Sequence, residues 1–172
     1  ASVLDDLNAR ADVVTMANIA QTINVLQCVV RTDETDAWPT PTYRVFDLYR
    51  PHVGAESLRT DVEADVREVE ADGGHEDVPL LSASASRSDA GVFLTLTNRG
   101  LDAREVRVEL GAEPGTASAT AAFGGQDPAD YATARNAEEF APSEWAVDVD
   151  AGCAVLEAPP ASVVAVEFGG SR

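Results

Sequence analysis

Four side-chain amides recur at every third position of an otherwise apolar run, Val13–Val30. They are Asn18, Gln21, Asn24 and Gln27, and the run holds no charged residue although acids crowd both of its sides. A segment this apolar is expected to be buried, and a buried amide needs hydrogen-bond partners to offset its loss of water. An amide can also donate to and accept from the hydroxyls of a substrate. The run is therefore expected to form either core or one wall of a polar site.

Gln21 is the amide that we single out. Apolar residues occupy both alternating faces of Val13–Ala17, which is typical of a short parallel strand covered on both sides. Gln21 would stand at or just past the carboxyl end of this strand, and in barrel folds that end carries the active site. It is interpreted either as a ligand for a substrate hydroxyl or as a buried amide satisfied by the backbone. Its position alone favours neither.

The residue types of other catalytic sites are present without the spacing that those sites need. No GxSxG, HExxH, P-loop or Rossmann glycine motif occurs. His52, beside Pro51 at an expected helix end, is interpreted as a cap or packing residue, and His75 as an exposed loop residue. Cys28 and Cys153 lie far apart in apolar runs, without a CxxC motif, and are expected to be two buried free thiols. The sequence thus indicates no metal site and no cofactor.

Charge excludes several classes of partner. The 172 residues include 30 acids against 12 basic residues, all Arg, for a formal net charge of −18. Such a chain lacks the basic patch of a nucleic-acid-binding protein and is repelled by anionic membranes. We interpret the dispersed acids as a solvated surface adapted to high salt. The run Val13–Val30 is long enough for a membrane span, but its amides make it too polar for lipid.

The first 52 residues predict a helix, a strand, a loop and a second helix. Ala1–Arg10 has the apolar spacing of the last turns of a helix, and Thr32–Trp38 is a polar loop. Thr40 suits the N-cap and Pro41 the first position of a helix that Pro51 ends. This order is that of the final βα unit of a larger barrel. Because the chain starts inside a helix, without an initiator Met or a visible signal peptide, we expect a truncated or split chain and a cytoplasmic location.

The pattern changes to alternation after His52. Short strands separated by turn residues are expected at Val62–Arg67, Leu80–Ser84, Val92–Leu96, Val106–Leu110, Thr116–Phe123, Trp145–Val149, Ala154–Leu156 and Ser162–Phe168. This spacing predicts an antiparallel β-sandwich, here of jelly-roll type. The fold class is therefore an α/β barrel fragment, the last βα unit of a (β/α)₈ barrel, followed by an all-β sandwich. The expected domains are residues 1–52 and 53–172.

Several stretches in succession resemble one enzyme family. The stretch ADVVTMANIAQTINVLQ, followed by TPTYRVFDLYRPH, is similar to the carboxyl-terminal region of the α-L-arabinofuranosidases of glycoside hydrolase family 51. LLSASASRSDAGVFLTLTN resembles the start of the family's terminal sandwich, ATARNAEEFAPSEW its long loop and APPASVVAVEF its closing strand. The match runs in the right order over nearly the whole chain, so it is more specific than a single motif.

The resemblance implies a retaining glycosidase that releases terminal non-reducing α-L-arabinofuranosyl residues with two glutamates. Both glutamates lie upstream in the family, so it implies no catalytic residue in this chain, which alone should be inactive. Gln21 matches a glutamine that contacts the arabinofuranose. Trp38, in a loop that varies in the family, is a weaker candidate for the same cleft. The implied partners are an arabinose-containing oligosaccharide or polysaccharide and the rest of the barrel, and a homo-oligomer stays open.

The alternative is a stand-alone carbohydrate-binding or interaction sandwich without catalysis. Such modules present a row of exposed aromatic side chains on which sugars stack. Past residue 53 the aromatic residues are Phe93, Phe123, Tyr131, Phe140, Trp145 and Phe168. Several of these fall on strand faces that are expected to point inward, which favours a capping role for the sandwich.

Overall fold

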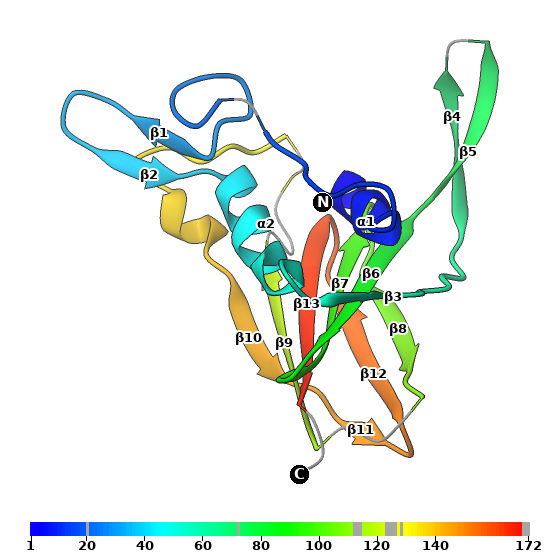
Figure 1. Ribbon diagram of the computed structural model, residues 1–172. Helices are drawn as coiled ribbons and strands as arrows, with labels where there is room; N and C mark the ends of the chain where they lie inside the picture. Colours follow the sequence, from blue (N-terminus) through cyan, green and yellow to red (C-terminus); the bar gives the residue numbers. More distant parts are fainter. Residues whose placement is uncertain (20, 72, 112–114, 123–126, 128, 170–172) are drawn as a thin grey trace.

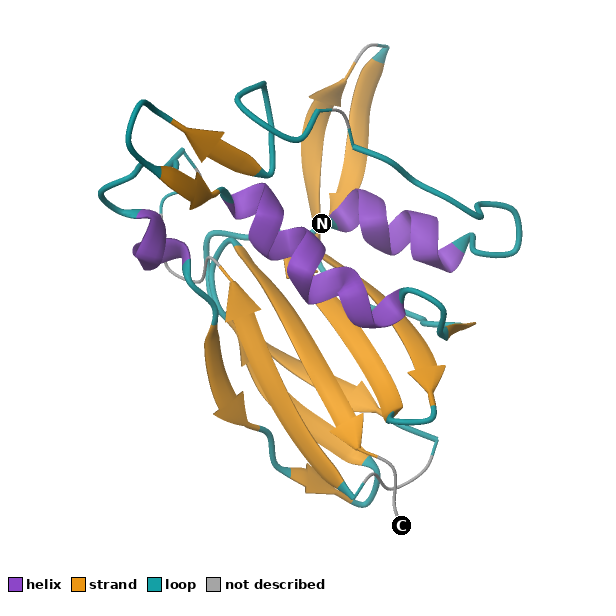
Figure 2. Ribbon diagram, turned by 60° about the vertical axis from the view of Figure 1, so that its left-hand side comes forward, coloured by secondary structure: helices purple, strands orange, loops and turns teal. Residues whose placement is uncertain are grey.

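Two antiparallel sheets packed face to face form the body of the molecule, and two helices cover the outer face of the larger sheet (Figure 1, Figure 2). The computed structural model describes residues 1–172 except residues 20, 72, 112–114, 123–126, 128 and 170–172. The predicted Phe123 end of one strand lies outside these described residues. The prediction of antiparallel β-structure is confirmed.

The helices form where the sequence predicts them. Helix α1 spans Ser2–Ala9 and helix α2 spans Pro41–Tyr49. At the start of α2 the Thr40 hydroxyl accepts the Tyr43 N–H at 3.4 Å, and proline occupies the first turn, where its missing N–H costs nothing. A 3₁₀ turn, η1 (Arg50–His52), carries Pro51 and ends the helical segment.

The larger sheet has six strands in the order β10-β9-β13-β7-β6-β3, all antiparallel. Their bounds are β3 Glu56–Leu58, β6 Leu81–Ser88, β7 Gly91–Asn98, β9 Thr116–Ala122, β10 Ser143–Ala146 and β13 Ser162–Gly169. Strands β6 and β7 form a hairpin whose turn is Ser88-Asp89-Ala90-Gly91, with Ser88 opposite Gly91. Gly91 has φ +134°, a conformation that glycine adopts without strain.

The smaller sheet has three strands in the order β11-β12-β8, with bounds β8 Arg104–Glu109, β11 Val149–Asp150 and β12 Cys153–Ala158. A separate hairpin of β4 (Val66–Ala71) and β5 (Gly74–Pro79) projects away from the body (Figure 1). A short 3₁₀ turn, η2 (Ala137–Phe140), lies in the long loop before β10. The free thiols are confirmed at Cys28, which is buried, and at Cys153, which is only half-buried.

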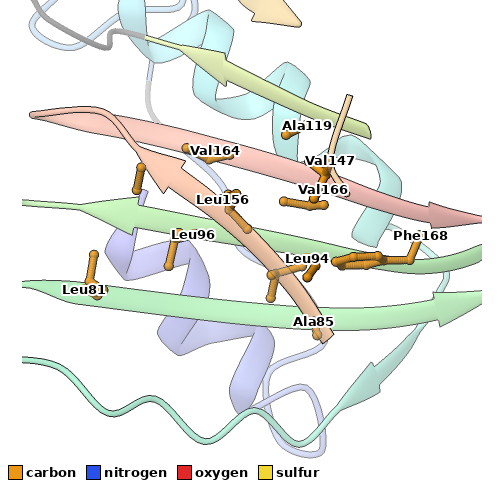
Figure 3. Packing of buried hydrophobic residues seen from close by; sticks show 12 residues of the cluster. Leu81, Ala85, Leu94, Leu96, Ala119, Val147, Leu156, Val164, Val166 and Phe168 are labelled. Carbon is orange, nitrogen blue, oxygen red and sulfur yellow. The ribbon is translucent and has the colours of Figure 1, made fainter. Parts of the chain in front are cut away.

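The core lies between the two sheets. Leu94, Leu96, Val164 and Val166 from the larger sheet contact Leu156 of β12 and its neighbours (Figure 3). Successive side chains of a strand point to opposite faces of the sheet. On the outer face, away from the core, β6 and β7 carry the small hydroxyl side chains of Ser and Thr and the ring of Phe93. This period-two pattern follows from strand geometry and explains why one face of the sheet is apolar and the other suits a polar contact.

Helices α1 and α2 lie on that outer face (Figure 2). Leu48 and Tyr49 of α2 pack on Phe93, Val163 and Ala165 of β7 and β13, and this second apolar cluster is separate from the core. The predicted packing role of His52 is confirmed, because its ring lies edge-on to Phe93 with 4.9 Å between the centroids. The two helices and the larger sheet are therefore tightly joined.

The expectation for Val13–Val30 is wrong for this chain. Val13–Ala17 forms no strand, and all of its side chains except the half-buried Val14 are exposed, Met16 being 75% exposed. The four amides are exposed too, and Asn24 and Gln27 take φ of +54° and +58°. Such left-handed residues bend the chain into a loop. The physical reason is that a parallel strand forms by pairing with a neighbouring strand and is buried by cover on both faces, and no strand of the described residues pairs with Val13–Ala17.

Three smaller expectations are corrected. The predicted loop Thr32–Trp38 is instead a hairpin of β1 (Val30–Thr32) and β2 (Ala37–Pro39). The alternation at Val62–Arg67 becomes a strand only from Val66, and His75 lies in strand β5 rather than in a loop, although it is exposed. The division of the chain near Val53 stays a prediction.

Candidate substrate-binding site

Gln21 lies in the irregular segment between α1 and β1. Its side chain is exposed, and no described residue forms a hydrogen bond with its amide. Immediately after it the chain closes a loop, because the Thr22 carbonyl accepts the N–H groups of Val29 and Val30, each at 3.1 Å. An unpaired amide at the rim of a closed loop has its donors and acceptor free for a polar ligand.

Asn24 fixes this loop on the hairpin. Its side chain donates to the Thr32 hydroxyl at 2.7 Å and accepts the Thr32 N–H at 2.8 Å. The Thr40 hydroxyl in turn donates to the Cys28 carbonyl at 2.6 Å, which ties the end of the loop to the start of α2. The segment thus has a defined downstream anchor, even though most of its apolar side chains lie open.

Trp38 has its indole N–H engaged by the protein itself. The Nε1 atom donates to the Ala132 carbonyl at 3.2 Å, which joins strand β2 to the long loop before β10. No hydrogen bond links Trp38 to Gln21 in the described part of the chain. Their connection runs along the chain: β1 follows the loop that Gln21 opens, and Arg31 of β1 pairs with Trp38 of β2. The face of the indole, and not its N–H, is what remains for a ligand.

A buried polar cluster around Asp5 was not predicted from the sequence. This carboxylate is 2% exposed and accepts hydrogen bonds from five hydroxyls. The donors are Tyr49 (2.7 Å), Ser82 (2.8 Å), Ser84 (3.0 Å), Thr95 (3.1 Å) and Thr97 (3.1 Å). The one available signal was the placement of Ser82, Ser84 and Ser86 at every second position of β6, which put hydroxyls on a single face.

Two titratable neighbours of Asp5 are held in their neutral forms. Burial, followed by the charge of Asp5, raises the pKa of the Tyr49 phenol above its ordinary value, so the phenol stays protonated and can donate. Burial lowers the pKa of His52 in spite of the opposing influence of Asp5. The His52 ring nitrogens lie 2.8 Å from the Ser86 hydroxyl and 3.0 Å from the Thr95 hydroxyl. Neutral hydroxyls and a neutral imidazole therefore surround the carboxylate.

A cleft of about 1390 Å³ opens between the two sheets beside β8. Its floor is aliphatic, as at Leu81, Leu94 and Val108, and its rim carries charges of both signs, as at Arg87 and Glu109. Phe168 is the only aromatic residue among the described residues that line it. Without an aromatic platform the cleft lacks the stacking surface that sugar-binding modules use.

The aromatic side chains elsewhere disfavour a sugar-binding surface as well. Phe93, Phe140 and Phe168 are buried and Trp145 is half-buried, so Tyr131 is the only exposed one of those past residue 53 whose side chains are described. Phe123 lies outside the described residues. The described residues also contain no group of three or more His, Cys, Asp or Glu that could hold a metal ion. None of the helices in the described part has the length and apolar character needed to cross a membrane.

Comparison with known proteins decides the family. The sequence profile of the alpha-L-arabinofuranosidase C-terminal domain matches residues 1–162. The chain belongs to this family. The resemblance read from the sequence is thereby confirmed.

Individual relatives agree with this assignment. The intracellular exo-alpha-L-arabinofuranosidase of Bacteroides ovatus is 37% identical over 110 residues, which are 63% of this chain and 21% of that protein. The crystal structure of the glycoside hydrolase family 51 arabinofuranosidase from Xanthomonas axonopodis pv. citri superposes with a TM-score of 0.84 at 28% identity, over 95% of this chain and 33% of that one.

A thermostable relative gives the same result. The family 51 alpha-L-arabinofuranosidase from Thermotoga petrophila RKU-1 has a TM-score of 0.80 at 25% identity, over 95% of this chain and 36% of its own. The chain therefore spans about a fifth of the curated relative and about a third of each solved structure.

Proposed function

We propose that this chain is the carboxyl-terminal part of a retaining α-L-arabinofuranosidase that releases terminal non-reducing α-L-arabinofuranosyl residues from arabinosides. The observation that carries the proposal is the family match over residues 1–162, in a chain that spans only a third of its structural relatives. In this proposal residues 1–52 are the last βα unit of a (β/α)₈ barrel. Residues 53–172 form a jelly-roll-like sandwich that caps the barrel.

The exposed apolar segment supports this arrangement. Val13, Met16 and Leu26 are large apolar side chains left open to solvent within a span of 14 residues. Leaving such surface in water costs about 25 cal/mol per Å². In the complete protein the neighbouring barrel strands would cover these side chains and would let Val13–Ala17 pair as a parallel strand, so that Gln21 stands at its carboxyl end.

The proposed chemistry places catalysis outside this chain. Two glutamates from the rest of the barrel, about 5–5.5 Å apart, act as nucleophile and as acid/base through a covalent glycosyl-enzyme. Gln21 binds a hydroxyl of the arabinofuranose. A neutral amide there leaves the pKa values of the two carboxyls apart, whereas a charged residue would shift both. Trp38 lines the same cleft with its ring face. The substrates are arabinose-containing oligosaccharides or polysaccharides, and the location is cytoplasmic.

Hydrolysis of p-nitrophenyl α-L-arabinofuranoside tests the proposal. The complete protein is expected to hydrolyse it and the 172-residue chain alone is expected to be inactive. Hydrolysis by the short chain alone would place the catalytic residues here and contradict the proposal. Failure of the complete protein to hydrolyse any arabinofuranoside would refute the assigned activity.

Gln21→Ala tests the binding residue. The substitution should lower kcat/KM of the complete protein by roughly 5- to 150-fold, the equivalent of about 1–3 kcal/mol for a lost buried polar partner. Asn18→Ala is the matched control, because Asn18 is an exposed amide of the same segment. Equal effects of the two substitutions would remove the special role of Gln21.

A further inference from the structure

The Asp5 cluster is built to hold a carboxylate in one orientation. Its five hydroxyl donors come from α2, β6 and β7, three elements that are far from α1 in sequence. A carboxylate has about four lone-pair sites on two oxygens, and here Oδ1 accepts three hydrogen bonds and Oδ2 two. Among the described residues no salt bridge reaches Asp5, so the five hydroxyls are its side-chain hydrogen-bond partners, and the charge of the Ala1 ammonium acts on it as well. A carboxylate buried in this way fixes the helix that carries it.

The hydrogen bonds around Asp5 also have a defined direction. With the Thr95 proton assigned to the Asp5 carboxylate, the Thr95 oxygen accepts from His52, and this assigns the proton of the neutral imidazole to Nε2. The other ring nitrogen, Nδ1, then accepts from the Ser86 hydroxyl. The orientation set at Asp5 thus continues through Thr95 to η1. Hydrogen bonds therefore connect Asp5 of α1, through Thr95 of β7, to His52 of η1.

Helix α1 is the upstream anchor of the segment that carries Gln21. A turn at its end, in which the Arg10 carbonyl accepts the N–H groups of Val13 and Val14 at 3.0 and 2.8 Å, leads directly into that segment. Between this turn and Thr22, the described residues 15–19 and Gln21 form no hydrogen bond with other described residues. Within these 172 residues the stretch that carries Gln21 is therefore held at its two ends, by α1 on one side and by the loop closed at Thr22 on the other.

We propose that Asp5 is a positioning residue for Gln21: it locks α1 onto the β6–β7 face of the sheet and thereby fixes the upstream end of the substrate-binding segment. The proposal rests on the proposed role of Gln21. It gives the carboxyl-terminal part of the chain a task beyond capping: β6 and β7 hold the upstream end through Asp5, and the loop before β10 contacts the downstream hairpin through Ala132 and Trp38.

A double-mutant cycle in the complete protein tests whether Asp5 acts through Gln21. In Asp5→Asn the amide nitrogen cannot accept the hydroxyls that one carboxylate oxygen accepted, so kcat/KM on p-nitrophenyl α-L-arabinofuranoside should fall about tenfold. In the Gln21→Ala background the same substitution should cost nothing further. Asp6→Asn, an exposed neighbour on the same helix, is the control and should leave kcat/KM unchanged. Losses that add fully in the double variant overturn the proposal.

Hydrogen exchange in the 172-residue chain provides a readout that does not need catalysis. Asp5→Asn should speed amide exchange in α1 while β7 and β13 keep their protection, and unchanged exchange in α1 overturns the proposal. Where Asp5→Asn fails to fold, Thr97→Val removes one donor of the five at nearly constant shape and should give a smaller change in the same direction. Hydrolysis that is unaffected by Asp5→Asn overturns the positioning role alone. Absence of hydrolysis by the unmodified complete protein overturns the proposed function with it.

Discussion

Two apolar stretches of this chain differ in burial and in strand pairing. Strand β13, Ser162–Gly169, lies between β7 and β9, and almost all of its side chains are buried on one face or the other. The run Val13–Val30 is similarly apolar, yet Leu26 in it is 86% exposed and its backbone is mostly irregular. Hydrophobicity alone therefore does not bury a segment: β13 pairs along its length with β7 and β9, whereas the described residues of Val13–Val30 pair only at Ile23 and Val30.

The largest expected effect comes from removing a core side chain and comparing it with an open one. Leu156→Ala leaves a cavity between the two sheets, where Leu156 is 4% exposed, and should lower the free energy of unfolding by about 2–5 kcal/mol. Leu26→Ala should change it by less than about 0.5 kcal/mol, because Leu26 is 86% exposed and buries little surface. Urea unfolding of the 172-residue chain measures both. A costly Leu26→Ala in this chain would show that the segment is packed after all.

Leu26→Ala and Leu156→Ala can also be compared in the complete protein. If barrel strands cover Val13–Val30 there, Leu26→Ala should become destabilising by about 1–3 kcal/mol, whereas the cost of Leu156→Ala should stay the same. A Leu26→Ala effect that stays near zero in the longer protein would argue against coverage of this segment.

The outer face of the larger sheet offers a second contrast, since it is buried by polar contacts instead of apolar ones. Tyr49→Phe removes the donor to the charged Asp5 and should cost about 1.5–3 kcal/mol at neutral pH. The folded protein raises the Tyr49 pKa above the ordinary value of 10.0, so the unfolded chain ionises first. The stability from Tyr49 is therefore fully present below about pH 10 and is lost as the pH rises further.

Urea unfolding between pH 8 and pH 11 checks the sign of this effect. The difference between the unmodified chain and Tyr49→Phe should be constant up to about pH 10 and should then shrink by up to roughly 1.4 kcal/mol per pH unit. The chain has no Lys that would deprotonate in the same range. A difference that grows with pH would mean that the phenol is ionised in the folded protein.

A third prediction concerns the anchor of the open segment. Trp38→Phe keeps an aromatic ring in β2 but removes the N–H that donates to Ala132, and should lower the free energy of unfolding by about 0.5–1.5 kcal/mol. Exchange of the β1–β2 amides should quicken while the core strands keep their protection. Equal loss of protection throughout the chain would show that the hairpin unfolds only together with the core.

Local signals explain which parts of the fold were predictable. Thr40 and Pro41 fix the start of α2, Ser88–Gly91 fixes a hairpin turn, and the alternation of Val164, Val166 and Phe168 fixes a strand, each from neighbouring residues alone. The family, and with it the candidate Gln21, could be recognised from ordered stretches of sequence. These signals need no knowledge of what packs against them.

The wrong expectation for Val13–Ala17 and the unpredicted Asp5 cluster have a different physical origin. The irregular state of Val13–Ala17 depends on which strands lie beside it, and no strand of the described residues pairs with it, which the periodicity of its own residues does not report. The Asp5 cluster depends on residues 44 to 92 positions away, which only the assembled sheet brings together. In the sequence Asp5 is one of 30 acids, and an acid on a short helix is normally a solvated one. Both failures are therefore failures to foresee non-local contacts.

The smallest expected effect concerns the β4–β5 hairpin, which projects away from the two packed sheets. Glu68 of β4 pairs directly with Asp77 of β5, and like charges opposite each other destabilise a ladder by about 0.2–1 kcal/mol. Asp77→Arg should raise the free energy of unfolding by a few tenths of a kcal/mol at low salt.

Molar NaCl screens the repulsion, so the melting temperature of the unmodified chain should rise with salt and the gain from Asp77→Arg should vanish. Thermal melts at low and molar NaCl measure both. A melting temperature that is flat or falls with salt would contradict the interpretation of the acidic surface, and a gain that persists in molar NaCl would have a cause other than charge.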